Sequence, residues 1–282
     1  MTSEGTGAHG RRPRPDPPEP LGATTIDAHT HLDACGCATA DDVAAAMDRA
    51  GAVGVARAVT IADDLHAARW AVAAAHWDDR VYAAAALHPT RTAAVTAQDL
   101  AEIERLDADE RVVAVGETGL DYYWDHAPPA AQQECFRWHI GLAKRVGKPL
   151  MIHDRDAHDD VLRILREEGP PETVVFHCFS GDAAMAVQCV DAGYVLSFAG
   201  PVTFKNSHAL REAAALVPDD GYLVETDAPF LTPHPHRGRA NEPYCLPWTV
   251  RGIADVRGES AERVAEVTRG NAERTFRLAG TG

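Results

Sequence analysis

The sequence predicts an α/β fold, a (β/α)8 TIM barrel whose active site lies at the carboxyl ends of its strands, and three observations support this. Eight short β-branched or apolar runs follow one another from Thr24 onward. Each run is followed by a stretch long enough for a helix, and the eight units fill about 255 residues, as a barrel of this type requires. No change in composition interrupts the alternation. Because alternation alone does not show closure of the sheet, a doubly wound open sheet is the alternative.

The chain begins with a segment that differs from the rest, which sets the predicted domain boundary. Residues 1–23 contain the sequence RRPRPDPPEP, with five prolines in ten positions and almost no apolar residues before Leu21. This composition is typical of a disordered leader. Residues 24–282 are predicted to form a single barrel domain.

The predicted elements follow in chain order from hydrophobic periodicity. The strand runs are 25–32, 53–61, 81–88, 112–120, 150–154, 174–179, 194–199 and 222–227. Between them, stretches such as 130–146 and 159–168 repeat apolar residues at steps of three and four, the spacing of one helix face. Gly51, Gly147, Gly169 and Gly193 follow helical stretches, where a left-handed residue commonly ends a helix.

Charge and composition exclude several classes of protein. The formal net charge is −15, from 27 basic and 42 acidic residues, and the leader is neutral. A protein that coats DNA needs an excess of Lys and Arg, so any nucleic-acid role must depend on a local site. No apolar stretch is long enough to span a bilayer, and no secretory signal is recognised. Six scattered cysteines are typical of free thiols in a reducing compartment, so we expect a cytoplasmic location without membrane contact.

Metal-capable side chains occur at the ends of five different strand runs. His29 and His31 are two residues apart in the first run and therefore share one face. The other positions are Glu117 in the fourth run, His153 in the fifth, His177 in the sixth and Asp227 in the eighth. Because the carboxyl ends of barrel strands converge on one rim, we expect these six groups to meet there.

The predicted ligand set indicates the metals and the chemistry. Imidazoles with carboxylates suit Zn²⁺ or Mn²⁺, and Mg²⁺ where water completes the shell. Six ligands exceed the needs of one tetrahedral ion but suit two divalent ions that share a carboxylate. Glu117 is the expected shared carboxylate, and Asp227 is expected both to hold an ion and to take the proton of the attacking water. Glu117 and Asp227 are therefore the predicted catalytic residues.

The motifs that carry these residues resemble the TatD-type metal-dependent deoxyribonucleases of the amidohydrolase superfamily. They are IDAHTHLD, LHP, VGETGLDYYW, IHDRDAHDD, HCFSG, ETDAP, RGRANEP and GNAERTF, in this order between residues 24 and 278. The resemblance implies a metal-dependent hydrolase with a (β/α)8 fold and 3′–5′ DNA exonuclease activity. It also implies metal positions at His29, His31, Glu117, His153, His177 and Asp227.

Basic and polar residues near the same rim are candidates for substrate binding. Arg155 lies two residues after His153, and His88 ends the third run. The others lie in loops after the strands and are Lys205, Arg237, Arg239 and Asn241. Such donors hold the phosphates next to a scissile phosphodiester. Tyr122, Tyr123 and Trp124 could stack a terminal base.

The leading hypothesis is a two-metal hydrolase, a monomer, that cleaves phosphodiester bonds at the 3′ end of DNA. The alternative keeps the metals and changes the bond, to an ester or amide hydrolase such as an aminoacyl-tRNA deacylase or a lactonase. A third hypothesis is a metal-carrying scaffold without turnover.

Overall fold

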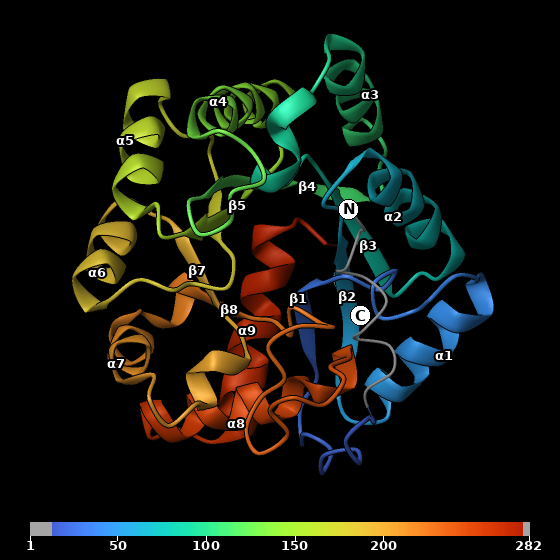
Figure 1. The fold of residues 1–282 in the computed structure, drawn as a ribbon. Helices are drawn as coiled ribbons and strands as arrows, with labels where there is room; N and C mark the ends of the chain where they lie inside the picture. The colour runs from blue at the N-terminus through green and yellow to red at the C-terminus, as the bar shows by residue number, and fades with distance from the viewer. Residues whose placement is uncertain (1–12, 279–282) are drawn as a thin grey trace.

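The computed structural model describes residues 13–278, in which eight parallel strands form one barrel (Figure 1). The strands, in barrel order, are β1 (Thr25–Thr30), β2 (Val55–Ile61), β3 (Val81–Ala85), β4 (Val112–Asp121), β5 (Leu150–Arg155), β6 (Val174–Phe176), β7 (Val195–Phe198) and β8 (Tyr222–Val224). Each strand pairs with the next along the chain.

The barrel closes between its first and last strands. A parallel bridge joins Thr30 to Ala228, the Asp227 N–H donates to His29 O at 2.9 Å, and the His31 N–H donates to Ala228 O at 2.7 Å. The predicted (β/α)8 barrel is confirmed, and the open-sheet alternative is wrong because these contacts join the end of β1 to the chain just after β8.

The helices surround the strands in an outer ring, except for α9, which lies in the middle of the view and packs against β1 and β8 (Figure 1). They are α1 (Ala40–Gly51), α2 (Leu65–Trp77), α3 (Ala97–Asp107), α4 (Pro129–Val146), α5 (His158–Glu168), α6 (Ala183–Asp191), α7 (His208–Leu216), α8 (Leu246–Arg257) and α9 (Ala261–Thr275). Short 3-10 turns lie at η2 (Pro89–Ala94), η3 (Gly200–Thr203), η4 (Asp219–Gly221) and η5 (Pro243–Cys245). Thr39 and Thr96 begin α1 and α3 with capping boxes, in which side chain and backbone satisfy each other's donors.

Three helix ends test the predicted glycine caps. Gly147 ends α4 with φ +67° and Gly169 follows α5 with φ +70°, as predicted. Gly51 is instead the last residue of α1, and Gly54 is the left-handed residue after it. The prediction was wrong there because α1 continues through Gly51 and the chain turns later.

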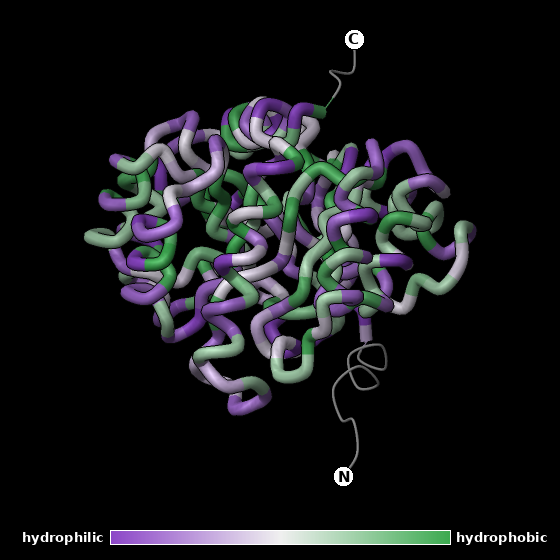
Figure 2. Tube along the Cα trace, turned by 90° about the horizontal axis from the view of Figure 1, so that it is seen from above, coloured by the Kyte–Doolittle hydropathy of each residue, from purple (hydrophilic) through white to green (hydrophobic). Residues whose placement is uncertain are grey.

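The apolar side chains form two layers, one between the strands and the outer helices and one inside the barrel. The interior layer contains alternate strand residues such as Ile26, Ala28 and Val175, and Phe276 and Leu278 beyond α9 pack against it. Hydrophobic segments accordingly concentrate in the interior and hydrophilic ones outside (Figure 2). The polar side chains gather at the other end of the barrel, away from Phe276 and Leu278.

Residues 13–23 of the predicted leader lie against the barrel. The Tyr244 hydroxyl donates to Pro15 O at 2.7 Å, the Arg251 guanidinium donates to Glu19 O at 2.6 Å, and the Leu21 N–H donates to Val53 O at 3.1 Å. The structure differs here from the predicted disorder because these carbonyls find donors, while the prolines restrict the backbone in advance. Residues 1–12 of the leader lie outside the described residues.

Within residues 13–278, no helix is long and apolar enough to cross a membrane.

Candidate metal centre

The structure brings the six predicted ligands together at one end of the barrel. His29 lies in β1, Glu117 in β4 and His153 in β5. His31 and His177 follow directly after β1 and β6, and Asp227 is the third residue after β8. Five of the six are buried, and His153 is partly exposed. Groups of three or more side chains there lie close enough to hold an ion, including His29 with His31 and Glu117, and Glu117 with His153 and His177.

Glu117 lies between two pairs of imidazoles. Its Oε1 atom is 3.9 Å from His29 Nε2 and 3.5 Å from His31 Nε2. Its Oε2 atom is 3.3 Å from His153 Nδ1 and 2.7 Å from His177 Nε2. The carboxylate therefore faces two ligand groups, one with each oxygen.

Asp227 belongs to the first of these groups. Its Oδ1 atom is 3.6 Å from His29 Nε2 and 3.5 Å from His31 Nε2, and these two nitrogens are 3.2 Å apart. Asp227 has φ +51°, a left-handed conformation that is uncommon for a residue with a side chain and occurs often at functional sites. This backbone turns the carboxylate toward the imidazoles of β1.

Two glycines explain why β4 can carry Glu117 so close to β5. A Cβ atom on Gly116 would lie 2.5 Å from Met151 Cβ, and one on Gly119, which has φ +138°, would lie 2.1 Å from His153 O. Any larger residue at either position would push β4 away from β5. The glycines thus allow Glu117 to approach His153.

Three carboxylates lie next to the ligands, and none of them is among the predicted site residues. Asp121 Oδ2 is 3.0 Å from His153 Nε2, and Glu225 Oε1 is 3.4 Å from His177 Nδ1. Asp27 accepts from the Thr226 N–H at 2.9 Å. Their positions contain a signal, because Asp121 lies four residues from Glu117 and the other two lie two residues from a ligand. Side chains at even spacing share a face.

The electrostatics of the centre keep Glu117 ionised. Burial alone would raise the pKa of Glu117, but the neighbouring imidazoles of His177, His88 and His153 outweigh burial and hold that pKa well below its usual value. Burial lowers the pKa of His177, yet Glu117 and Glu225 raise it well above the ordinary histidine value. The carboxylates therefore favour the positively charged form of His177 and would equally favour a cation beside it.

The donor set fits divalent cations. Glu117 Oε2 and His177 Nδ1 are buried without a partner in hydrogen-bond geometry among the described residues, although charged groups surround them. Converging imidazole nitrogens and carboxylate oxygens suit Zn²⁺, Mn²⁺ and related ions. Carboxylates that orient ligating histidines through the second ring nitrogen are a regular part of such sites, and Asp121 and Glu225 occupy those positions.

The predicted substrate-binding residues fall into two sets. His88 lies next to the centre, with ring centroids 4.4 Å from His153, and its Nδ1 pairs with the Thr90 hydroxyl at 2.7 Å. Asn241 is buried, and its amide donates to Thr226 O at 2.9 Å and to Phe230 O at 2.6 Å. Its contacts in the structure therefore hold the loop that follows Asp227.

The basic candidates lie further out and are exposed. Arg155 stacks over Tyr123, with the guanidinium carbon 3.8 Å from the ring centroid. Arg237 lies 4.7 Å from the Phe204 ring centroid, and Lys205 follows that phenylalanine. The remaining candidate, Arg239, is also exposed. Aromatic faces thus hold two of the guanidinium groups in place while their N–H donors face solvent.

Comparison with known proteins gives a consistent result. The family model described as TatD related DNase matches residues 26–277. The chain is 59% identical over 258 residues to the "Uncharacterized metal-dependent hydrolase TatD" of Mycobacterium tuberculosis (strain ATCC 25618 / H37Rv), covering 90% of this chain and 98% of that protein. It is 34% identical over 251 residues to the "3'-5' ssDNA/RNA exonuclease TatD" of Musicola paradisiaca (strain Ech703), covering 86% and 93%. The crystal structure of YJJV, a TatD homolog from Escherichia coli K12, has a TM-score of 0.84 at 29% identity and covers 90% of this chain and 98% of its own.

Proposed function

The chain belongs to the TatD-related DNase family and is a metal-dependent hydrolase, and we propose that it removes nucleotides from the 3′ end of single-stranded DNA with two divalent cations. The name of the Musicola paradisiaca relative, a 3′–5′ exonuclease of single-stranded DNA and RNA, supports the bond, the strand and the direction. The alternative of an ester or amide hydrolase uses the same centre and is tested below.

The observation that carries the proposal is the position of Glu117. One of its oxygens faces His29 and His31, and the other faces His153 and His177. A carboxylate with a separate imidazole pair at each oxygen suits two ions that share a ligand. The first ion would be held by His29, His31, Glu117 and Asp227, and the second by Glu117, His153 and His177.

Two divalent cations bound there would lower the pKa of a water molecule and balance the charge of the phosphate. The remaining steps belong to the protein. Asp227, at the rim end of β8, is positioned to accept the proton that water loses as it attacks phosphorus. Asp121 and Glu225 orient the rings of His153 and His177 throughout.

Side chains at the rim of the barrel are placed to bind the substrate. Arg155 stacks on Tyr123 and directs its donors outward, where a phosphate next to the scissile one would accept two of them. Tyr123 and Trp124 are large exposed aromatic residues, with 55% and 47% of their surface accessible. Exposed aromatic faces bind unpaired bases by stacking, which favours a single strand or a frayed end over an intact duplex. A local grip of this kind agrees with the net charge of −15.

The proposal is tested with purified protein that is stripped of metal and reloaded with Mg²⁺, Mn²⁺ or Zn²⁺. An oligonucleotide labelled at its 5′ end is expected to give a ladder of successively shorter products, because cleavage starts at the 3′ end. Glu117→Gln is expected to bind fewer ions per chain and to leave the oligonucleotide intact. Glu212→Gln, the same change on the exposed surface of α7, is the matched control and should behave like the unmodified protein.

Two results would contradict the proposal. Intact oligonucleotide under all three metals, together with hydrolysis of a carboxyl ester such as p-nitrophenyl acetate, would favour the ester hydrolase instead. Equal activity of the unmodified protein and Glu117→Gln would show that the paired imidazoles are not the catalytic centre.

A further inference from the structure

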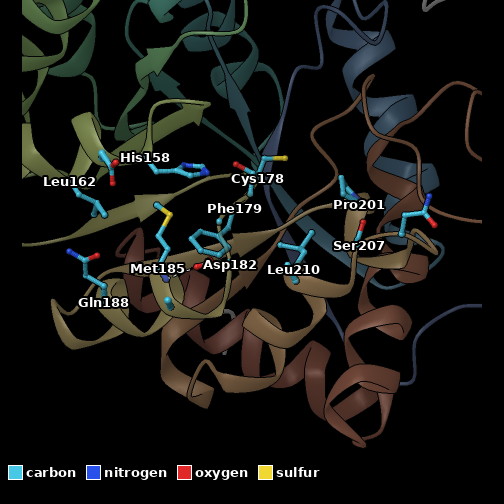
Figure 3. Close-up of a pocket in the computed structure, with 16 residues that line it drawn as sticks. His158, Leu162, Cys178, Phe179, Asp182, Met185, Gln188, Pro201, Ser207 and Leu210 are labelled. Carbon is cyan, nitrogen blue, oxygen red and sulfur yellow. Dashed lines mark hydrogen bonds between the residues drawn. The ribbon is translucent and has the colours of Figure 1, made fainter.

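A cavity of about 710 Å³ lies beside the metal centre, where the loop after β6 meets α5, α6 and α7 (Figure 3). Its size falls within the range of about 300–1,000 Å³ that is usual for small-molecule sites. The proposed two-metal chemistry does not use this cavity, and neither does the proposed binding of phosphate by Arg155.

The cavity adjoins the metal centre at the end of β6. Cys178, which lines it, is the neighbour of His177, and its N–H donates at 2.7 Å to Glu225 Oε1, the same atom that faces His177 Nδ1. Cys178 has φ +42°, so the chain turns sharply between the centre and the cavity. From the other side, the His158 ring extends from α5 toward Cys178 (Figure 3). Cys178 therefore connects the lining of the cavity to the ligand His177 and to Glu225 behind it.

The lining combines apolar surfaces with uncharged polar groups. Leu162, Phe179, Met185 and Leu210 supply apolar surface from α5, the β6 loop, α6 and α7. Amides and hydroxyls stand among them, from Gln188, Asn206, Ser180 and Ser207. Mainly apolar walls with a few polar groups are usual for small-molecule sites. A flat ring that carries hydrogen-bonding edges matches such a lining.

The charge of the lining argues against a phosphate as occupant. Neither Lys nor Arg is among the residues that line the cavity, while Asp159 and Asp182 are. His158, the one histidine in the lining, is paired with Asp154 at 2.7 Å. Arg155, the nearest basic residue along β5, lies against Tyr123 on the rim instead. Phosphate binding and ring binding are thus separated on the two sides of the β5 end.

We propose that this cavity is the subsite for the nucleobase of the terminal nucleotide. The inference rests on the proposed phosphodiesterase function, since it assigns the group attached to the cleaved phosphate. It adds that the enzyme recognises a base as well as a phosphate, so that a strand end without a base is a poor substrate.

The first test is a binding measurement that needs no turnover. Isothermal titration of the metal-loaded protein with a deoxynucleoside 5′-monophosphate and with deoxyribose 5-phosphate compares ligands that differ only in the base. We expect the nucleotide to bind at least about tenfold more tightly, as one base contact provides. Ala184→Trp fills the cavity from an exposed position on the first turn of α6 and should abolish this difference. Val187→Trp, an exposed residue of α6 outside the cavity, is the matched control and should retain it.

The second test uses hydrolysis. Ala184→Trp should lower kcat/KM about tenfold for an oligonucleotide with a normal 3′ end and leave bis(p-nitrophenyl) phosphate, a diester without a base, within about twofold. Equal binding of the two ligands by the unmodified protein, or a selectivity that Ala184→Trp leaves intact, would overturn the inference. Selective nucleotide binding that Ala184→Trp abolishes, without hydrolysis of any diester, would overturn the proposed function and support the subsite.

Discussion

Replacement of Glu225 by glutamine measures how much this carboxylate contributes to metal binding. Glu225 lies next to the predicted ligand His177, on the side of the ring away from Glu117. Glu225 is buried, its Oε1 atom accepts from the Cys178 N–H at 2.7 Å, and the same atom is 3.4 Å from His177 Nδ1. Glutamine keeps the shape and the acceptor oxygen and removes the negative charge.

The size of the effect follows from this distance. Two unit charges 3.4 Å apart attract by about 5 kcal/mol at an effective dielectric constant of about 20. The Nδ1–H group of a ligating imidazole carries only part of a unit charge, so we expect about 1.4–2.7 kcal/mol in the free energy of metal binding. This corresponds to a roughly 10–100-fold loss of affinity, the range found for carboxylates that orient ligating histidines.

The assay is competition with a chromophoric chelator for Zn²⁺ or Mn²⁺. Burial raises the pKa of Glu225 against the opposing influence of His177, so the neutral glutamine also relieves the cost of a buried charge. The thermal midpoint of the metal-free protein should therefore not fall. Unchanged metal affinity in Glu225→Gln, or the same shift in the surface control Glu212→Gln, would refute the reasoning.

Three further predictions concern other parts of the molecule. His139 is fully buried, accepts from the Leu87 N–H at 3.3 Å, and has its pKa lowered by burial from 6.5 to about 4. Its neutral form stabilises the fold fully above pH 6.5, and this contribution is lost as pH falls from 6.5 toward 4. In urea titrations, the difference in unfolding free energy between the unmodified protein and His139→Gln should therefore narrow by about 2 kcal/mol from pH 7.5 to pH 5. A difference that stays constant with pH would contradict this prediction. Arg155→Gln should lower kcat/KM for an oligonucleotide about 10–100-fold and leave any carboxyl-ester hydrolysis unchanged, because only a phosphate needs the charged donor; equal losses on both substrates would indicate a structural effect. Deletion of residues 1–20 removes the acceptors of Tyr244 and Arg251 and should lower the thermal midpoint by about 4–8 °C, as the loss of roughly 2 kcal/mol does in a domain of this size; an unchanged midpoint would show that these bonds contribute nothing.

The sequence predicted the barrel because its evidence is periodic and repeated. Each strand run recurs at the length of one strand–helix unit, and an error at one run does not change the number of units. The strand ends were less predictable. The sixth and eighth runs were expected to reach residues 179 and 227, whereas β6 ends at Phe176 and β8 at Val224. The residues beyond them are apolar or polar in the same alternation, but Cys178 and Asp227 adopt left-handed backbone and leave the ladder.

The ligand positions were predictable because spacing by two places His29 and His31 on one face, and strand ends converge. The same reasoning applies to Asp121 and Glu225 and would have placed them near the centre. Spacing alone does not distinguish a ligand from a carboxylate that orients a ligand, because the two differ by small shifts in the tilt and register of a strand.

Contacts between distant segments escaped prediction for a different reason. The cavity beside Cys178 depends on the path of one loop past three helix ends, and the position of residues 13–23 depends on donors more than 200 residues away. A proline-rich composition describes the free segment and carries no information about the surface that receives it.

The junction of β1 and β8 has a consequence for biosynthesis. The hydrogen bonds there join His29 and His31 to Asp227 and Ala228, which are far from them in the sequence. A nascent chain still held by the ribosome before Asp227 has emerged lacks one of these partners. The six ligand candidates, which span residues 29 to 227, can therefore come together only after the chain has been synthesised through Asp227, and a product that ends before this residue would lack one of them.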